Sequence, residues 1–522
     1  MTSVTFPSLG RFGVIKDKPA QELPVNSRTS PGMAWSDALN MRFRNGAIER
    51  FLGEKRVFDA PVVTPYYLQQ YNQGGSRWWV HAGLNAIYAD NGTTRLNVTP
   101  TTAPTGAIDD RYTGGTLNGV NVLNNGKDAP WYWGGSGVFL PLTAWPAATR
   151  AASIRPYKNV LVALDITKNV GTTNDRFPHM VKWSDVAAPG SVPGSWDQND
   201  KTKLAGEIDL AEEPSLMVDQ LQLADANIIY KENAMFSMIA TGGQDVFRFQ
   251  RLPGSIGALA RGCVANTDLG HVVLAAGDVV LHSGQGPQSI INNVMRKWLF
   301  RTIDSTNRKR SFVTTNPVAK EVWVCFPELG KASCSLAAVW NWVENTWAIR
   351  QLNNATYGTT GQIDYSAFSA WAAQTDTWQD AASAWDEDQY SPAQARLLTC
   401  STTPAINAMD ITATFNGSVY TSYVERTGIS MDAPSMVKLI RSIVPRVDAA
   451  KGTRIQFEVG SQMDIEAPVT WSPAATHTVG GGFKVDTFSN GARFLALRIS
   501  SLDNQPWRID SCDIDIVSQG RY

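Results

Sequence analysis

The sequence has few of the side chains that usually perform chemistry in proteins. Among 522 residues there are only five cysteines and five histidines. The cysteines are odd in number and scattered, with no Cys-x-x-Cys pair, so we expect five buried free thiols rather than disulfides or a zinc site. They are Cys263, Cys325, Cys334, Cys400 and Cys512. His271 and His282 fall on adjacent expected strands, where a structural pair is favoured over a metal site.

Catalytic motifs are also missing. There is no Gly-x-Ser-x-Gly turn and no phosphate-binding loop, and Gly284-Gln-Gly286 lacks the third glycine of a dinucleotide-binding motif. Carboxylates cluster at 386–388 and at Asp510, Asp513 and Asp515, but glycoside hydrolysis needs two carboxylates that face each other across a cleft. For Asp510, Asp513 and Asp515 we expect a solvated strand face or ion pairs. The sequence therefore predicts no catalytic residue, no metal site and no cofactor.

Long hydrophobic runs and an excess of charge are absent too. The longest apolar runs, such as Val272–Ala276, are far shorter than the roughly 20 residues of a membrane helix, and the first nine residues do not read as a signal peptide. The 46 basic and 47 acidic residues nearly cancel. This balance argues against a dedicated nucleic-acid binder, although it does not exclude a conduit through which nucleic acid passes.

Glycine, tryptophan and tyrosine are abundant, with 42, 18 and 14 residues respectively. Many turns and many large rings favour an all-β chain of short strands. Between residues 62 and 352 the expected strands fall into six segments, each about the length of a four-stranded propeller blade. The segments are 62–100, 106–148, 150–208, 214–260, 262–308 and 310–352. We predict a β-propeller with six blades, and an array of β-sandwiches remains the alternative.

The pattern divides the chain into four parts. An N-terminal extended arm and β-hairpin is expected over 1–60, the propeller over 61–351, a Trp-rich connecting segment over 352–405, and an antiparallel β-sandwich or barrel over 406–522. Because residues 1–34 are proline-rich, we expect this segment to lie across a neighbouring subunit or to close the propeller. The connecting segment has rings at seven-residue intervals, which we interpret as anchors of a loop, with a sugar-stacking platform as the alternative. These rings are Trp371, Trp378 and Trp385.

One run of positive charge stands out in this balanced chain. It consists of Arg296, Lys297, Arg301, Arg308, Lys309 and Arg310. Basic residues around an aromatic ring can hold a phosphate backbone, so DNA contact is one interpretation. The apolar residues 298–300 interrupt the run, so a short amphipathic helix with a structural or subunit-facing role is the other.

Two distinctive segments lie near the ends of the chain. Trp35–Gly53 predicts a tight hairpin, because Asn45-Gly46 tolerates the positive φ angles of a two-residue turn. This segment resembles the opening of the tail nozzle (tail-hub) proteins of short-tailed bacteriophages. Trp507–Arg521 resembles the closing strand of the same family. The middle of the chain supports the resemblance only through its layout.

The resemblance implies a structural virion protein of the phage tail, assembled in the bacterial host cytoplasm. It implies a homohexameric ring beneath the portal adaptor (head-to-tail connector), with tail fibre or spike proteins as further partners. The ring would extend the channel for double-stranded DNA, retain the packaged genome and let it pass at infection, without enzymatic activity or a cofactor. This chain is short for the family, so an extended tip or gate is expected to be reduced. The alternatives are a propeller-based tail-associated glycan binder or glycoside hydrolase, and a cellular propeller scaffold.

Overall fold

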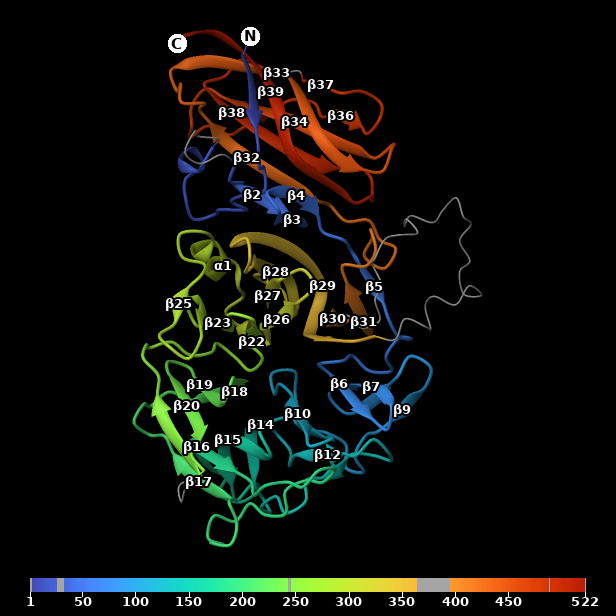
Figure 1. The fold of residues 1–522 in the computed structure, drawn as a ribbon, viewed down its shortest axis with the longest axis vertical. Helices are drawn as coiled ribbons and strands as arrows, with labels where there is room; N and C mark the ends of the chain where they lie inside the picture. The colour runs from blue at the N-terminus through green and yellow to red at the C-terminus, as the bar shows by residue number, and fades with distance from the viewer. Residues whose placement is uncertain (1, 26–31, 243–245, 364–394, 488, 522) are drawn as a thin grey trace.

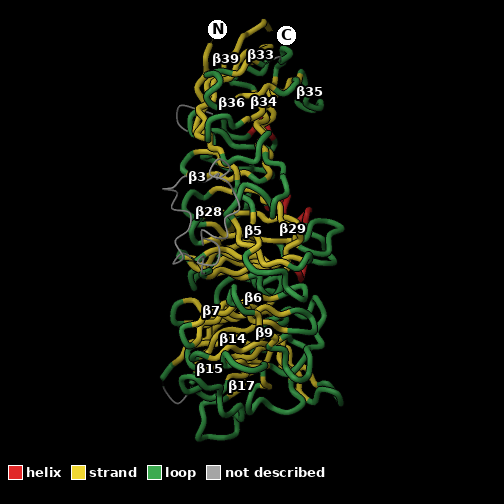
Figure 2. The backbone as a smooth tube through the Cα atoms, turned by 90° about the vertical axis from the view of Figure 1, so that its right-hand side faces the viewer, coloured by secondary structure: helices red, strands yellow, loops and turns green. Residues whose placement is uncertain are grey.

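The computed structural model describes residues 2–25, 32–242, 246–363, 395–487 and 489–521. These residues form antiparallel strands and turns almost throughout, and the described part contains a single α-helix, α1 (Arg296–Thr302). The all-β expectation is confirmed. Figures 1 and 2 show a long, narrow molecule with two parts placed end to end, a body of small sheets and a C-terminal pair of larger sheets.

The body consists of six sheets, and each of the first five is built from four strands that follow one another along the chain. The first contains β6 (Tyr67–Gln73), β7 (Ser76–Ala82), β8 (Ile87–Asp90) and β9 (Arg95–Asn97). The second contains β10 (Thr113–Leu117), β11 (Val120–Asn124), β12 (Trp131–Trp133) and β13 (Leu140–Pro141). The third contains β14 (Arg150–Tyr157), β15 (Val160–Lys168), β16 (Asp175–Trp183) and β17 (Gly206–Asp209). The fourth contains β18 (Met217–Leu223), β19 (Ala226–Lys231), β20 (Met235–Ala240) and β21 (Phe247–Arg251). The fifth contains β22 (Val264–Thr267), β23 (Gly270–Leu274), β24 (Val279–His282) and β25 (Gln288–Ser289). Each of the first five predicted segments therefore contains the strands of one sheet, apart from Asp209 at the end of β17.

Neighbouring sheets bury their apolar faces against each other. Tyr157 and Val162 of the third sheet, for example, pack with Ile229 and Phe236 of the fourth. The first strands β10, β14, β18, β22 and β26 contact one another in that order, and β29 contacts both β26 and β6. Figure 1 shows the sheets following one another around the body, from the first in blue to the sixth in yellow. A single small sheet could not cover its own two faces, so this stacking is what makes the body stable.

The sixth sheet is larger than the pattern predicts. It contains β26 (Phe312–Asn316), β27 (Glu321–Phe326), β28 (Cys334–Asn341), β29 (Thr346–Gly361), β30 (Arg396–Ser401), β31 (Ala405–Met409) and β5 (Glu54–Arg56). The long strand β29 pairs first with β28 and then with β30. Parts of the expected segments 1–60, 352–405 and 406–522 therefore belong to the body, because long-range pairing joins them to β29. The three evenly spaced tryptophans and the 386–388 carboxylates lie outside the described residues.

The C-terminal part has two six-stranded sheets. One contains β1 (Thr2–Phe6), β3 (Met41–Arg44), β4 (Ala47–Arg50), β33 (Met436–Ala449), β37 (Val485–Asp486) and β39 (Trp507–Arg521). The other contains β2 (Asp37–Leu39), β32 (Tyr423–Ile429), β34 (Arg454–Gln462), β35 (Thr470–Trp471), β36 (Ala475–Thr478) and β38 (Phe494–Ser501). Ile443 and Ile514 of the first sheet share one buried core with Val459 and Leu497 of the second.

The start of the N-terminal segment pairs with the chain's own closing strand, and residues 14–17 contact the body through the carbonyls of Trp347 and Val294. Contact of this segment with a neighbouring subunit stays a prediction. β1 pairs antiparallel with β39, from Thr2 opposite Ile516 to Phe6 opposite Cys512. The predicted hairpin is confirmed: Arg44 pairs with Ala47 across Asn45 (φ 51°) and Gly46 (φ 72°). An extended, proline-containing segment needs a sheet edge to satisfy its backbone, and β39 provides one within the same molecule.

Candidate functional site

The two segments that carry the family resemblance meet in space. In the sheet, Ile48 of the hairpin is opposite Ile509 of the closing strand, and Glu49 is opposite Arg508. The Arg508 guanidinium lies 3.4 Å from the Glu49 carboxylate. Residues from the two ends of the chain therefore form one structural unit, which also contacts the body.

A buried ion-pair cluster fastens this unit to the sixth sheet. Arg42 of β3 donates to both carboxylate oxygens of Glu321 on β27, at 2.5 and 3.0 Å. It also donates to Asp410 at 2.5 Å, and the Asp410 carboxylate accepts from Asn316 at 2.9 Å. The two carboxylates raise the pKa of Arg42 against the opposing effect of burial, whereas burial raises the pKa of Glu321. Such a cluster fixes the geometry of the joint, because breaking it leaves an uncompensated buried charge.

A second buried cation lies beside this cluster. The Arg350 side chain is fully buried and its Nη2 donates to the carbonyl of Leu52 at 2.6 Å. Its guanidinium carbon lies 4.9 Å from the ring centroids of Phe51 and Phe415 and within 6 Å of those of Trp323 and Tyr420. The faces of aromatic rings attract a cation. The four rings around Arg350 therefore hold the body, the hairpin and the 410–420 connection together.

Sequence reasoning missed this joint. Arg42, Glu321 and Arg350 are hundreds of residues apart, and no local spacing connects them. One signal could have drawn attention to Glu321: it opens an otherwise apolar strand, Glu321–Phe326, and a charged residue in a strand buried on both faces needs a partner.

The basic run divides between α1 and a single 3-10 turn, η2 (Arg308–Arg310), on the connection from the fifth to the sixth sheet. We call its six cations, Arg296, Lys297, Arg301, Arg308, Lys309 and Arg310, the basic surface. The Asp17 carboxylate caps α1 by accepting from the backbone N–H groups of Lys297 and Trp298. The amphipathic-helix interpretation is confirmed for residues 296–302, because Leu299 is buried and Trp298 packs on Phe326.

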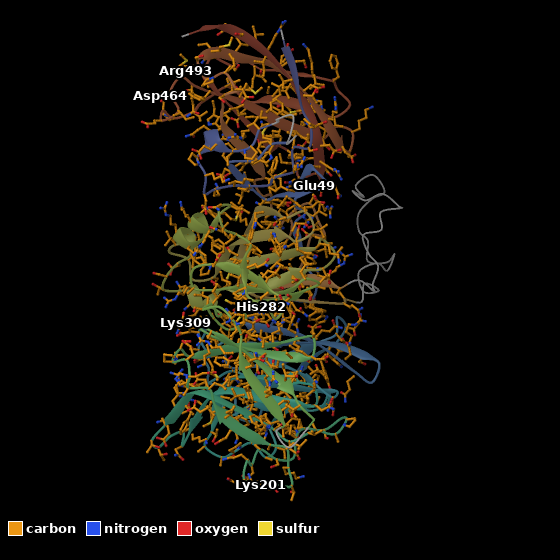
Figure 3. All side chains as sticks on the ribbon, turned by 60° about the vertical axis from the view of Figure 1, so that its left-hand side comes forward. Glu49, Lys201, His282, Lys309, Asp464 and Arg493 are labelled. Carbon is orange, nitrogen blue, oxygen red and sulfur yellow. The ribbon has the colours of Figure 1, made fainter. Side chains whose placement is uncertain are left out.

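Most of the basic surface is available to a partner. Arg310 pairs with Asp109 at 2.8 Å, and Arg296 lies 4.0 Å from Asp278. The other four cations are exposed and make no ion pair within the described part of the chain. Figure 3 shows Lys309 at the margin of the body. The run thus lies on two elements, α1 and η2, and all of its cations except Arg310 are exposed.

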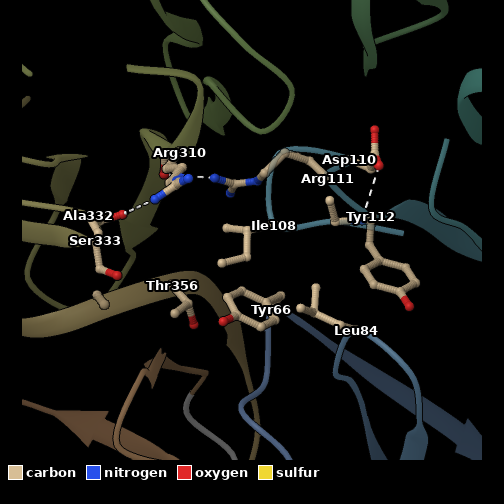
Figure 4. A pocket seen from close by; sticks show the side chains of 12 residues that line it. Tyr66, Leu84, Ile108, Asp110, Arg111, Tyr112, Arg310, Ala332, Ser333 and Thr356 are labelled. Atoms are coloured by element: carbon tan, nitrogen blue, oxygen red, sulfur yellow. Dashed lines mark hydrogen bonds between the residues drawn. The ribbon is translucent and has the colours of Figure 1, made fainter. Parts of the chain in front are cut away.

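Two of the cavities in the body lie near the basic surface or the meeting point of the first strands. One of about 20 Å³ lies beside Arg310, with Tyr66, Arg111 and Thr356 in its wall, and holds no more than one water molecule (Figure 4). The other, of about 290 Å³, lies where the first strands meet, and the ion pair of Arg155 with Asp219 (2.8 Å) is in its wall. Its polar lining includes threonines of β26 and β29. That volume is at the low end for a small-molecule site.

The remaining candidates have structural partners. Asp513 pairs with Arg446 and Asp510 with Arg508. All five cysteines are free and buried. Among the described residues no three histidine, cysteine or acidic side chains gather as metal ligands, and no helix there is long and apolar enough to cross a membrane. His271 and His282 do lie together, as the sequence predicts, opposite each other on β23 and β24.

Comparison with known proteins identifies no family. No family model matches the chain, and no curated protein matches it. Among solved structures, the computationally designed Ika8 protein is similar over 68% of this chain and 100% of its own, with 10% identity and a TM-score of 0.36. A score this low carries no argument about fold or function.

Proposed function

We propose that the protein is a structural subunit of a short phage tail. In this proposal it forms a sixfold ring beneath the portal adaptor, extends the DNA channel, retains the packaged genome and lets it pass at infection. Tail fibre or spike proteins are the further partners. The chain works in the virion after assembly in the bacterial cytoplasm, as a non-enzymatic protein without a cofactor.

The observation that carries the proposal is the pairing of β4 with β39. Trp35–Gly53 and Trp507–Arg521 resemble the same family independently, and they lie almost the whole chain apart. Chance similarity at two ends would not require the two segments to be neighbours in space. Their pairing supports a shared structural origin for the resemblance.

We further propose that the six sheets form a six-bladed propeller and that the two C-terminal sheets form a sandwich. The ordered contacts of the first strands support the propeller, and the contact of β29 with β6 supports its closure between the sixth and first blades. The shared core of the two larger sheets supports the sandwich.

The channel in this proposal runs between subunits. The cavity at the meeting point of the first strands has a volume of only about 290 Å³. The major groove of B-DNA alone is about 12 Å wide, so a duplex cannot pass through the axis of one subunit. A closed ring of several copies provides the space, through a heterologous contact repeated by rotation.

The basic surface is then a contact to DNA or to an adjacent subunit. Phosphate binding depends steeply on salt, whereas a protein–protein contact with a few ion pairs depends on it weakly. Salt dependence of association therefore distinguishes the two. Lys297→Glu with Arg301→Glu should weaken whichever contact the surface makes, because both side chains are exposed.

Genome retention in virions tests the proposal. Phage particles made without this protein should fill their heads and then lose their DNA, and supplying the wild-type chain should restore DNA-filled, infectious particles. Particles that keep their DNA and infect without the protein would contradict the proposal. Turnover of a host capsule polysaccharide by the purified chain would instead support the glycan hydrolase alternative.

A further inference from the structure

Tyrosine hydroxyls join neighbouring sheets of the body at several seams. Tyr71 of the first sheet donates to the carbonyl of Gly119 in the second at 2.7 Å, and Tyr157 of the third donates to the carbonyl of Asp225 in the fourth. These bonds link an uncharged donor to a backbone acceptor, so acid does not break them.

The seam between the fourth and fifth sheets is built differently. The Tyr230 hydroxyl on β19 lies 2.7 Å from Nδ1 of His271 and 2.7 Å from Nε2 of His282. The two imidazoles come from facing positions on β23 and β24 and are 0% and 2% exposed. A buried pair of titratable rings therefore takes the place of the backbone carbonyl found at the first–second and third–fourth seams.

The contacts fix where the protons lie. Nε2 of His271 is 3.0 Å from the carbonyl of Gln222, which can only accept, so this nitrogen carries a proton and Nδ1 does not. Tyr230 then donates to Nδ1 of His271 and accepts from Nε2–H of His282. Nδ1 of His282, left without a proton, accepts from the backbone N–H of Gly284 at 3.3 Å. Each donor has one acceptor, and both imidazoles are neutral.

An added proton has no place in this chain of hydrogen bonds. On His271 it would force Tyr230 to accept from both rings and leave the hydroxyl proton without an acceptor. On His282 it would point at the N–H of Gly284. A buried donor without an acceptor costs about 1–3 kcal/mol, and more when it is charged.

The charges around the pair do not compensate an added proton. Asp219 on β18 faces Tyr230, and its carboxylate is bound by Arg155 on β14 and by the backbone N–H of Gly262. No carboxylate among the described residues contacts either ring. Burial lowers the pKa of both His271 and His282 to about 4, and burial raises the pKa of Tyr230, which keeps its hydroxyl protonated.

A groove of about 550 Å³ runs along the same seam. Its wall includes Leu223, which follows Gln222, and Gly284, which donates to His282. Ile228, Ile239 and Leu252 are among its apolar lining residues. The residues that hold the histidine chain thus belong to the wall of the groove or adjoin it.

We propose that Tyr230, His271 and His282 form an acid-sensitive clasp that holds the fourth and fifth sheets together and, when protonated, opens the groove between them. The clasp is closed above about pH 6.5, the ordinary pKa of histidine. Because the closed state has the lower pKa, its stabilisation is lost as the pH falls from about 6.5 toward 4. At pH 5 the opening equilibrium rises on the order of thirtyfold per histidine.

Nitrogen NMR and amide hydrogen exchange on the full chain test the clasp. Both rings should be Nε2–H tautomers at pH 7.5, and exchange-protection factors in β19, β23 and β24 should fall at least thirtyfold at pH 5 relative to β15 of the third sheet. His271→Gln with His282→Gln should remove this pH dependence. Tyr157→Phe removes the hydroxyl that donates to the carbonyl of Asp225 at the third–fourth seam, and it should leave the pH dependence unchanged.

Several results would overturn the clasp. An Nδ1–H tautomer on either ring contradicts the proton assignment. Equal loss of exchange protection in β15 and β23 at pH 5 would show general acid unfolding. If the pH dependence of protection persists in the double glutamine variant, the titrating group lies elsewhere. If the double variant does not fold, two measurements still decide the proposal. One is the tautomer of each ring in the wild-type protein, and the other is the pH-dependent exchange of β19, β23 and β24 in wild type and in Tyr157→Phe.

Discussion

At the scale of residues, many buried cationic side chains of this protein contact backbone carbonyls or aromatic rings instead of carboxylates. Arg426 is fully buried and donates to the carbonyls of Ala20 and Leu23, which fastens the N-terminal segment to the C-terminal sheets. Lys438 donates to the carbonyls of Ser430 and Ala433 in the same manner. Arg350 combines one carbonyl with four aromatic rings. Each of these cations holds a loop or segment in place, so its role is structural and long-range.

The Arg42 cluster gives the sharpest test of these cations. Glu321→Gln should destabilise the protein by about 3 kcal/mol, because Arg42 stays buried with only one carboxylate partner. Lys320→Ala is the matched control: its ion pair with Asp268 is half exposed and should be worth less than about 1 kcal/mol. Urea denaturation measures both variants. Equal effects of the two substitutions would contradict the assigned role of Glu321.

The cysteines should be unreactive in the native protein. Burial raises the pKa of Cys263, Cys334 and Cys512 to about 12, so almost no thiolate is present at neutral pH. A thiol reagent should therefore react with none of the five in the folded chain and with all five after unfolding. Mass spectrometry that finds a native Cys325–Cys334 cross-link would refute this.

At the scale of elements, the sequence predicted the turns and strand pairings that depend on residues close together in the chain. The Asn45-Gly46 hairpin is confirmed because the two residues alone fix the turn. The first five segments each correspond to one sheet because consecutive short strands separated by turns pair with their neighbours. By contrast, β1 pairs with β39 and β5 pairs with β31, both distant in sequence, and no periodicity shows which sheet edge such a strand will join.

The N-terminal segment depends on close contact with the hairpin, and this contact is testable. A Cβ atom at Gly10 would lie 1.9 Å from the carbonyl oxygen of Ala47, so Gly10→Ala must push the segment away from β4. We expect a loss of about 1–3 kcal/mol. Gly194→Ala, where a Cβ meets nothing within 4 Å, should change the stability little. Thermal unfolding compares the two, and an unaffected Gly10→Ala variant would contradict the contact.

At the scale of the whole molecule, the chain ends form part of the framework. β1 and β39 pair with each other, β2 pairs with β32, and β31 lies in the sixth sheet. Removal of residues 406–522 would therefore leave β1 and β2 without partners, reduce the first C-terminal sheet to the β3–β4 hairpin and remove all of β31 except Ala405. The candidate sites differ in how far the sequence predicts them. The basic run is contiguous enough to be seen in the sequence, whereas the joint of Arg42, Glu321 and Arg350 forms only in the folded chain.

The central claim is that this chain builds a ring in a phage tail. Electron cryomicroscopy of the purified full-length protein, mixed with its portal adaptor, tests it most directly. The account predicts a sixfold ring on the adaptor, with a channel between subunits wide enough for duplex DNA and the C-terminal sheets in the wall between neighbours. A single copy standing alone on the particle, or a protein that does not bind the adaptor at all, would contradict it.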